Sequence, residues 1–171
     1  MKLLNKTQIK TIRKMQKELD LKVRENNNIA LDKDLSLEKY LALKTELFEF
    51  VNEIESFKYW KKNKGKEHIL EEACDTLHFI FSLAIDHNVE IVQDKELIKD
   101  FDVNAHETND LIGILDAIIS DIFISKDWGE LSTALMFLTV ILNKAGFDSK
   151  DLYEEYLRKN QVNHERQANN Y

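Results

Sequence analysis

Residues 45–57, TELFEFVNEIESF, and residues 71–81, EEACDTLHFIF, are the two stretches that decide the fold. Each places a pair of acidic residues, three positions apart, among apolar residues. The pairs are Glu46 with Glu49 and Glu72 with Asp75. On an α-helix this spacing puts both side chains of a pair on one face, about one turn apart. The pattern predicts two helices that direct four carboxylates into a common space.

Four carboxylates in one space indicate a metal site. Their charges repel strongly unless divalent cations neutralise them. Oxygen-only ligands favour Mg²⁺, with Mn²⁺ as a possible substitute. Because Mg²⁺ usually binds a few carboxylates and completes its shell with water and substrate phosphates, the pattern favours phosphate-ester or pyrophosphate chemistry.

Two other interpretations of the acidic residues stay open at this stage. In a chain with 31 acidic residues, a single pair at spacing three is commonly a solvated helix face. A di-iron carboxylate bundle would use the spacing of Asp75 and His78, but it needs a second acid-to-histidine motif on another helix, and none matches. We therefore expect His78 to be a satisfied histidine in or near the core.

The rest of the chain predicts an all-α bundle of about six helices in a single domain, residues 1–171. It contains no proline and four glycines, which favours long helices. We read a connector over residues 88–106 that contains a short helix, and Gly146 as a helix C-cap. Apolar periodicity predicts helices over residues 5–26, 36–57, 69–87, 107–125, 131–145 and from 149 to the mid-160s.

Composition excludes several classes of protein. The net charge of −7 argues against direct nucleic-acid binding, which needs a basic surface. The single cysteine, Cys74, forms no internal disulfide, fits a reducing cytoplasm and is expected to be a buried, inert thiol. No stretch is apolar for long enough to span a membrane, and the first residues lack a signal-peptide core. We expect a soluble, cytoplasmic protein, in the host cytoplasm if a phage encodes it.

The two acidic pairs, separated by 22 residues, resemble the signature of the all-α nucleoside triphosphate pyrophosphohydrolases, which include MazG-like enzymes and dimeric dUTPases. The tail YLRKNQVNHERQANNY is similar to the C-terminal nucleotide-binding motif of the dimeric dUTPases, and other positions also match. The matching tail residues are Lys159, Asn160, Asn163, Arg166 and Tyr171, and the others are Gln16, Trp60, Lys61 and Phe79. Two departures are Asn170 for the family's glycine and Asp20 for its asparagine.

The resemblance implies a Mg²⁺-dependent enzyme that hydrolyses dUTP to dUMP and pyrophosphate. All four acidic residues would bind metal, and Glu46 or Glu49 would orient or deprotonate the water that attacks the α-phosphorus. Lysines and Arg166 would bind phosphates. The tail asparagines would bind uracil, and Phe79 would occupy the space that a ribose 2′-hydroxyl requires.

The resemblance also implies partners. The similar enzymes are homodimers whose sites draw residues from both chains, and residues 107–145 are apolar enough to form such an interface. Compact versions occur in phages of Gram-positive bacteria, and dUDP is a possible second substrate. One alternative is a MazG-like pyrophosphatase for another nucleotide. The other is an interaction protein that binds a repressor of a mobile genetic element through its apolar helices and the 90–110 segment.

Overall fold

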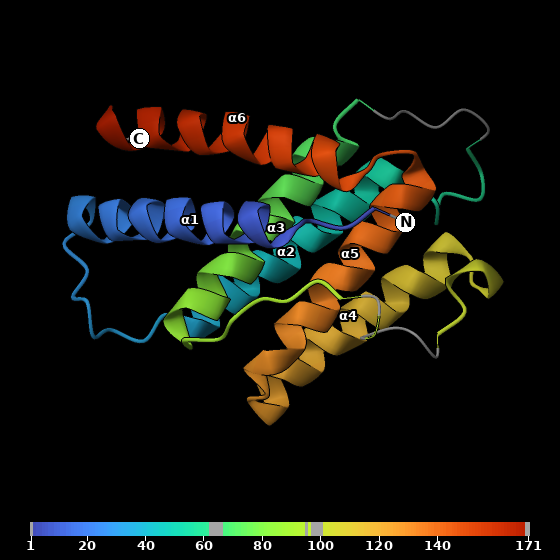
Figure 1. Cartoon of the computed structure of the whole chain (residues 1–171), viewed down its shortest axis with the longest axis horizontal. Helices are drawn as coiled ribbons and strands as arrows, with labels where there is room; N and C mark the ends of the chain where they lie inside the picture. The colour runs from blue at the N-terminus through green and yellow to red at the C-terminus, as the bar shows by residue number, and fades with distance from the viewer. Residues whose placement is uncertain (1, 62–66, 95, 97–100, 170–171) are drawn as a thin grey trace.

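The computed structural model describes residues 2–61, 67–94, 96 and 101–169, and Figure 1 shows that they form a bundle of helices. The described residues contain six α-helices, two short 3-10 helices and no strand, which confirms the predicted all-α fold. The α-helices are α1 (Lys6–Asn26), α2 (Ser36–Ile54), α3 (Ile69–Asp86), α4 (Thr108–Ser125), α5 (Leu131–Ala145) and α6 (Ser149–Ala168).

Local side-chain chemistry fixes where several of these helices begin and end. The Asn5 side chain accepts hydrogen bonds from the backbone N–H groups of Thr7 and Gln8, while the Gln8 side chain accepts one from the Asn5 N–H. This reciprocal arrangement satisfies donors that the first turn of α1 would otherwise leave unpaired. At the C-terminal end of α5, Gly146 adopts φ 99° and caps the helix, as predicted. Glycine enters the left-handed region without a steric penalty.

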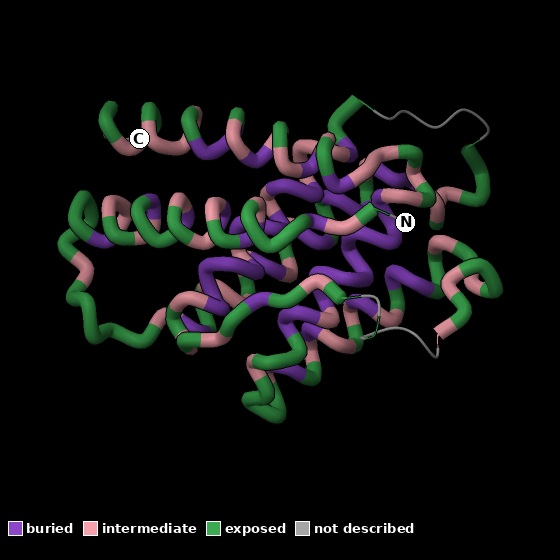
Figure 2. Tube along the Cα trace, viewed as in Figure 1, coloured by how far each residue is buried: buried purple, intermediate pink, exposed green. Residues whose placement is uncertain are grey.

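Helix α3 lies at the centre of the molecule and contacts α1, α2, α5 and α6. Most of its residues are buried, as are those of α5, and Figure 2 shows this inner position. Helix α2 packs along α3, α4 packs against α5, and α1 and α6 lie side by side across α3. Cys74 is buried in α3 without a disulfide, as expected. The arrangement presents one face of α3 to α2 and a neighbouring face to α6.

The connector between α3 and α4 was predicted to contain a short helix. Its described part includes the 3-10 helix η2 (Val103–Ala105). Before it, the Gln93 side chain accepts a hydrogen bond from the Leu4 N–H at 2.6 Å and donates one to the Thr139 hydroxyl at 2.6 Å. The chain start and α5 are thereby joined. Among the described residues, no helix is both long enough and apolar enough to cross a bilayer.

The packing between α2 and α3 predicts a large loss of stability on substitution of Leu47, which is fully buried. We expect Leu47→Ala to lower the free energy of unfolding by about 2–5 kcal/mol, since it removes buried methyl groups and leaves a cavity. Chemical denaturation followed by circular dichroism measures this. Leu31→Ala is the matched control, because Leu31 is 73% exposed and should change stability by less than about 0.5 kcal/mol. Equal effects of the two changes would contradict this packing.

Candidate active site

Three of the four predicted metal ligands lie together where α2 packs against α3. Glu46, Glu72 and Asp75 each offer one carboxylate oxygen, and these oxygens all lie within 4.8 Å of one another. All three side chains are partly buried. The packing of α2 against α3 therefore brings together Glu46 and Asp75, which are 29 positions apart in the sequence. Such a group of oxygen ligands suits a hard divalent cation.

Glu49 lies beside this group but is not part of it. It is exposed and lines a second, shallower pocket together with Glu72 and Phe48. The predicted four-carboxylate cluster is therefore a group of three, and Glu49 lies one turn further along α2, where it shares the second pocket with Glu72.

The electrostatics of the carboxylate group favour a bound cation. Burial, followed by the negative charges of Asp75, Glu49 and Glu72, raises the pKa of Glu46 to about 7. Burial is also the main cause that raises the pKa of Glu72 and of Asp75. Without a cation, a large share of Glu46 carboxyls hold protons near pH 7, where free carboxyls are ionised. A divalent ion would replace those protons.

Lys159, from α6, supplies one positive charge beside the carboxylates. Its ammonium lies 2.6 Å from an Asp75 oxygen and 3.0 Å from a Glu71 oxygen, and the residue is 6% exposed. Burial acts to lower the pKa of Lys159, but the hydrogen bonds to Asp75 and Glu71 raise it overall. The predicted phosphate-binding lysine is thus held next to the predicted metal ligands by two carboxylates.

A pocket of about 560 Å³ extends from the carboxylates between α1, α2, α3 and α6. This volume is in the range of small-molecule sites. Among its lining residues are six that the sequence predicted, and they come from four different helices. These are Gln16, Glu46, Asp75, Phe79, Asn163 and Arg166.

Besides Glu49, Glu72 and Lys159, three described residues that the sequence predicted for the site, Trp60, Lys61 and Asn160, do not line this pocket. Trp60 is 64% exposed in the loop after α2, and the Lys61 ammonium lies 2.6 Å from a Glu55 oxygen. Asn160 is 2% exposed, and its amide nitrogen has no hydrogen-bond partner among the described residues. Tyr171 lies outside the described residues.

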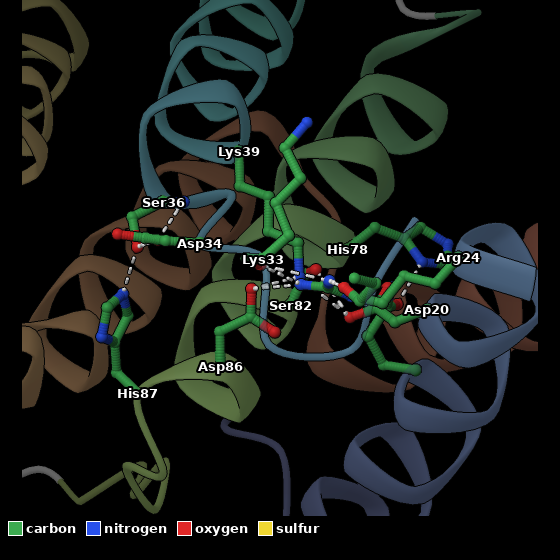
Figure 3. A network of polar contacts seen from close by, with 12 residues as sticks. Asp20, Arg24, Lys33, Asp34, Ser36, Lys39, His78, Ser82, Asp86 and His87 are labelled. Carbon is green, nitrogen blue, oxygen red and sulfur yellow. Dashed lines mark hydrogen bonds and ion pairs between the residues drawn. The ribbon is translucent and has the colours of Figure 1, made fainter. Parts of the chain in front are cut away.

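The sequence did not single out a polar network around Asp20, Lys39 and Ser82 (Figure 3), three residues that also line the pocket. The Asp20 side chain accepts from Ser82 at 2.7 Å, and Lys39 lies 2.6 Å from Asp86 and 3.5 Å from Asp20. A signal was present, because Lys39 precedes Glu46 by seven positions and Ser82 follows Asp75 by seven. Seven positions are two helical turns, so each shares a face with an acidic residue.

His78 is buried, as predicted, but it is only partly satisfied. Its Nδ1 lies 2.6 Å from the Gln16 amide oxygen, whereas its Nε2 has no partner among the described residues. Burial lowers the pKa of His78 to about 3. The imidazole is therefore neutral near pH 7, and it does not belong to the group of three carboxylates described above.

Comparison with known proteins identifies the family. A family model described as dUTPase matches residues 8–171, nearly the whole chain.

The chain belongs to the dUTPase family.

Membership indicates dUTP diphosphatase activity, with dUTP as the substrate, and confirms the predicted resemblance to all-α dUTPases. No curated protein matches the chain. In this family context, the carboxylate group and the adjoining pocket are the candidate active site of the dUTPase.

The raised pKa of Glu46 predicts how the stability of the metal-free dUTPase depends on pH. A carboxyl whose pKa is higher in the folded state binds more protons there, so its contribution is lost as pH rises from about 4.5 through about 7. We expect Glu46→Gln to match wild type near pH 5 and to melt a few degrees higher at pH 8, both in EDTA. Thermal melting followed by circular dichroism checks this.

Addition of Mg²⁺ provides the control for this effect. It should raise the melting temperature of wild type more at pH 8 than at pH 5, because the cation binds the ionised carboxylates. A Glu46→Gln protein whose difference from wild type is the same at both pH values would contradict the electrostatic description of the site.

Proposed function

We propose that the dUTPase is a Mg²⁺-dependent pyrophosphohydrolase that converts dUTP and water to dUMP and pyrophosphate. The observation that carries this proposal is the group of three carboxylates at one end of a pocket large enough for a nucleotide, in a chain of the dUTPase family. Mn²⁺ has similar ligand preferences and would be a substitute.

Glu46, Glu72 and Asp75 would hold the divalent ion, and Glu49 would complete the ligand set from the adjoining turn of α2. Their fit to a cation is supported by the closeness of their oxygens and by the raised pKa values that this closeness and burial cause. When bound, the ion would neutralise phosphate charge and lower the pKa of a bound water.

The reaction needs a base at the carboxylate end of the pocket. A carboxylate of the first pair, Glu46 or Glu49, would accept a proton from the water as its oxygen attacks the α-phosphorus. The bond between the α-phosphorus and the oxygen bridging to the β-phosphate then breaks, and pyrophosphate leaves with that oxygen. No covalent enzyme intermediate is required, because water itself is the nucleophile.

Other residues would bind the remaining parts of dUTP. Lys159 lies beside Asp75, and Arg166 lines the pocket, so both would contact phosphates. Phe79 lines the pocket and would exclude a ribose 2′-hydroxyl, and Asn163 would contact the nucleoside. Lys61 would have to leave Glu55 before it could reach a phosphate, while Trp60, Asn160 and Tyr171 remain proposed substrate-binding residues. Gln16 would act on the substrate through Asp20, because both polar ends of its amide are already engaged.

The first experiment measures pyrophosphate release from dUTP, dCTP, dTTP and UTP, with Mg²⁺ and with EDTA. We expect wild type to act on dUTP only with Mg²⁺. Glu49→Ala and Asp75→Ala should each lower kcat by roughly 10²–10⁴-fold or more, since they remove a base or a ligand. Both variants should retain the wild-type helical circular-dichroism spectrum.

Glu18→Ala is the matched control, because Glu18 is exposed on α1 and does not line the pocket. Substantial activity in Glu49→Ala and Asp75→Ala would refute the proposed site. Equal activity on several nucleotides would favour the MazG-like alternative, and activity on dUDP would extend the substrate range. No activity on any nucleotide would favour the interaction protein that binds a repressor.

We further propose that the dUTPase acts as a homodimer. Helix α2 carries three exposed apolar residues on one face, Leu37, Leu41 and Phe48, which are 52%, 55% and 51% exposed. Their spacing places them in a stripe along the helix. Phe48 also lines the shallow pocket that contains Glu49 and Glu72. A second copy covering this stripe would therefore lie next to the carboxylates and contribute to the site.

Leu41→Lys should convert a dimer to a monomer, because it places a charge in the apolar stripe. Light scattering coupled to size-exclusion chromatography would give wild type twice the 20.1 kDa mass of one chain and the variant close to one. Leu31→Lys is the matched control, since Leu31 lies in the loop between α1 and α2. A monomeric wild type, or a dimeric Leu41→Lys, would count against this interface.

A further inference from the structure

The pocket places a second set of polar side chains about one nucleoside length from the carboxylates. On α3, Asp75 and Ser82 are separated by seven residues, which is about 10 Å along a helix axis. On α2, Glu46 and Lys39 have the same separation. All four line one pocket. A nucleotide with its phosphates at Asp75 and Glu46 would therefore place its base near Lys39 and Ser82.

At that end, several donors hold the Asp20 carboxylate. Ser82 donates to Asp20 Oδ2 at 2.7 Å, and Gln16 Nε2 donates to Asp20 Oδ1 at 2.8 Å. The Lys39 ammonium lies 3.5 Å from Asp20 Oδ2. A carboxylate can accept about four hydrogen bonds, so Asp20 keeps capacity for one more donor.

The orientation of the Gln16 side chain is fixed by its neighbours. A carboxylate only accepts hydrogen bonds, so the amide nitrogen of Gln16 must face Asp20. Its amide oxygen then faces the Tyr156 hydroxyl at 3.1 Å and His78 Nδ1 at 2.6 Å, which must carry a proton. Gln16 is 4% exposed. It acts as a positioning residue for Asp20, since both ends of its amide are already engaged.

Lys39 is also held in place, by an ion pair with Asp86. Its ammonium lies 2.6 Å from Asp86 Oδ2, and its side chain is 12% exposed. The Arg24 guanidinium lies 3.8 Å from the same Asp86 oxygen and donates to the carbonyl oxygens of Ala30 and Lys33. Figure 3 shows this network. An ammonium has three donors, so Lys39 retains one beyond Asp86 and Asp20.

We propose that Lys39 and Asp20 together read the uracil edge of dUTP. Lys39 donates to the C4 carbonyl oxygen and Asp20 accepts the hydrogen bond of N3–H. The proposal rests on the function proposed above and specifies how that site chooses its base. In this chain the acceptor, Asp20, lies beside a separate donor, Lys39, so the two side chains together present the complement of the uracil edge.

Cytosine is rejected by the same pair. It presents an amino group where uracil has the C4 carbonyl, and an unprotonated nitrogen at N3. The donor of Lys39 would then meet a donor, and the acceptor of Asp20 would meet an acceptor, so polar groups of the site would lose their partners. Thymine has the same edge as uracil. The pair therefore discriminates dUTP from dCTP. Discrimination of dUTP from dTTP must come from other residues.

Lys39→Met tests the proposal, because it keeps the length of the side chain and removes the ammonium. We expect the ratio of kcat/KM for dUTP to that for dCTP to fall roughly tenfold or more. The ratio for dUTP to dTTP should change less than about twofold, since both bases lose the same contact. A general defect of folding would lower activity without this selectivity. Lys33→Met is the matched control, because the Lys33 side chain is exposed.

Ser82→Ala is the second variant. It leaves the Lys39–Asp86 pair intact and removes one donor that holds Asp20, so it should lower the dUTP-to-dCTP ratio in the same direction. Melting temperatures of both variants check that they fold. An unchanged ratio in a folded Lys39→Met would overturn the proposal.

Calorimetry with dUMP and dCMP separates this proposal from the proposed function. If wild type hydrolyses no nucleotide, the proposed function fails, and the base preference is still measurable as binding. Preferred binding of dUMP that is lost in Lys39→Met would support the recognition pair. Equal binding of both monophosphates by wild type would overturn it.

Discussion

The crowding of carboxylates between α2 and α3 is the constraint on which the rest of the site depends. Glu46, Glu72 and Asp75 repel one another and are partly removed from water, so they destabilise the pocket unless positive charge is present. Lys159 supplies part of that charge from α6. The arrangement persists because the other faces of α3 are buried in the apolar core, whose packing outweighs the local repulsion.

Helix α6, which lies across α3, meets this constraint. Its middle section carries Lys159 toward Asp75, and its later turns carry Asn163 and Arg166 to the same pocket. The Tyr156 hydroxyl, one turn earlier, contacts the backbone carbonyl of Ile12 and the Gln16 side chain on α1. One helix therefore contributes to charge balance, pocket lining and the docking of α1. The helices that hold the site are also the helices that close the core around it.

The sequence predicted what depends on local periodicity. The acidic pairs, the helix limits near residue 26 and at Gly146, and the core position of His78 all follow from spacing within one helix. Trp60 and Lys61 do not line the pocket, and apolar periodicity could not have predicted this, because it does not show where the chain turns after a helix. Helix α2 ends with Glu55 in the left-handed region, φ 56°, and the Glu55 carboxylate holds Lys61. Glycine or asparagine would have signalled such a turn, whereas glutamate does not.

The polar network was missed because its meaning is tertiary. Lysine and serine are common on helices, so the spacing of Lys39 from Glu46 and of Ser82 from Asp75 is a weak signal alone. This spacing becomes informative only when the fold places Asp20, 62 positions from Ser82, in contact with both Ser82 and Lys39. The orientation of Asp20 in turn depends on Gln16, and that of Gln16 on a neutral, buried His78. Because this chain of hydrogen bonds begins in the core, buried residues behind the pocket set the polarity of its wall.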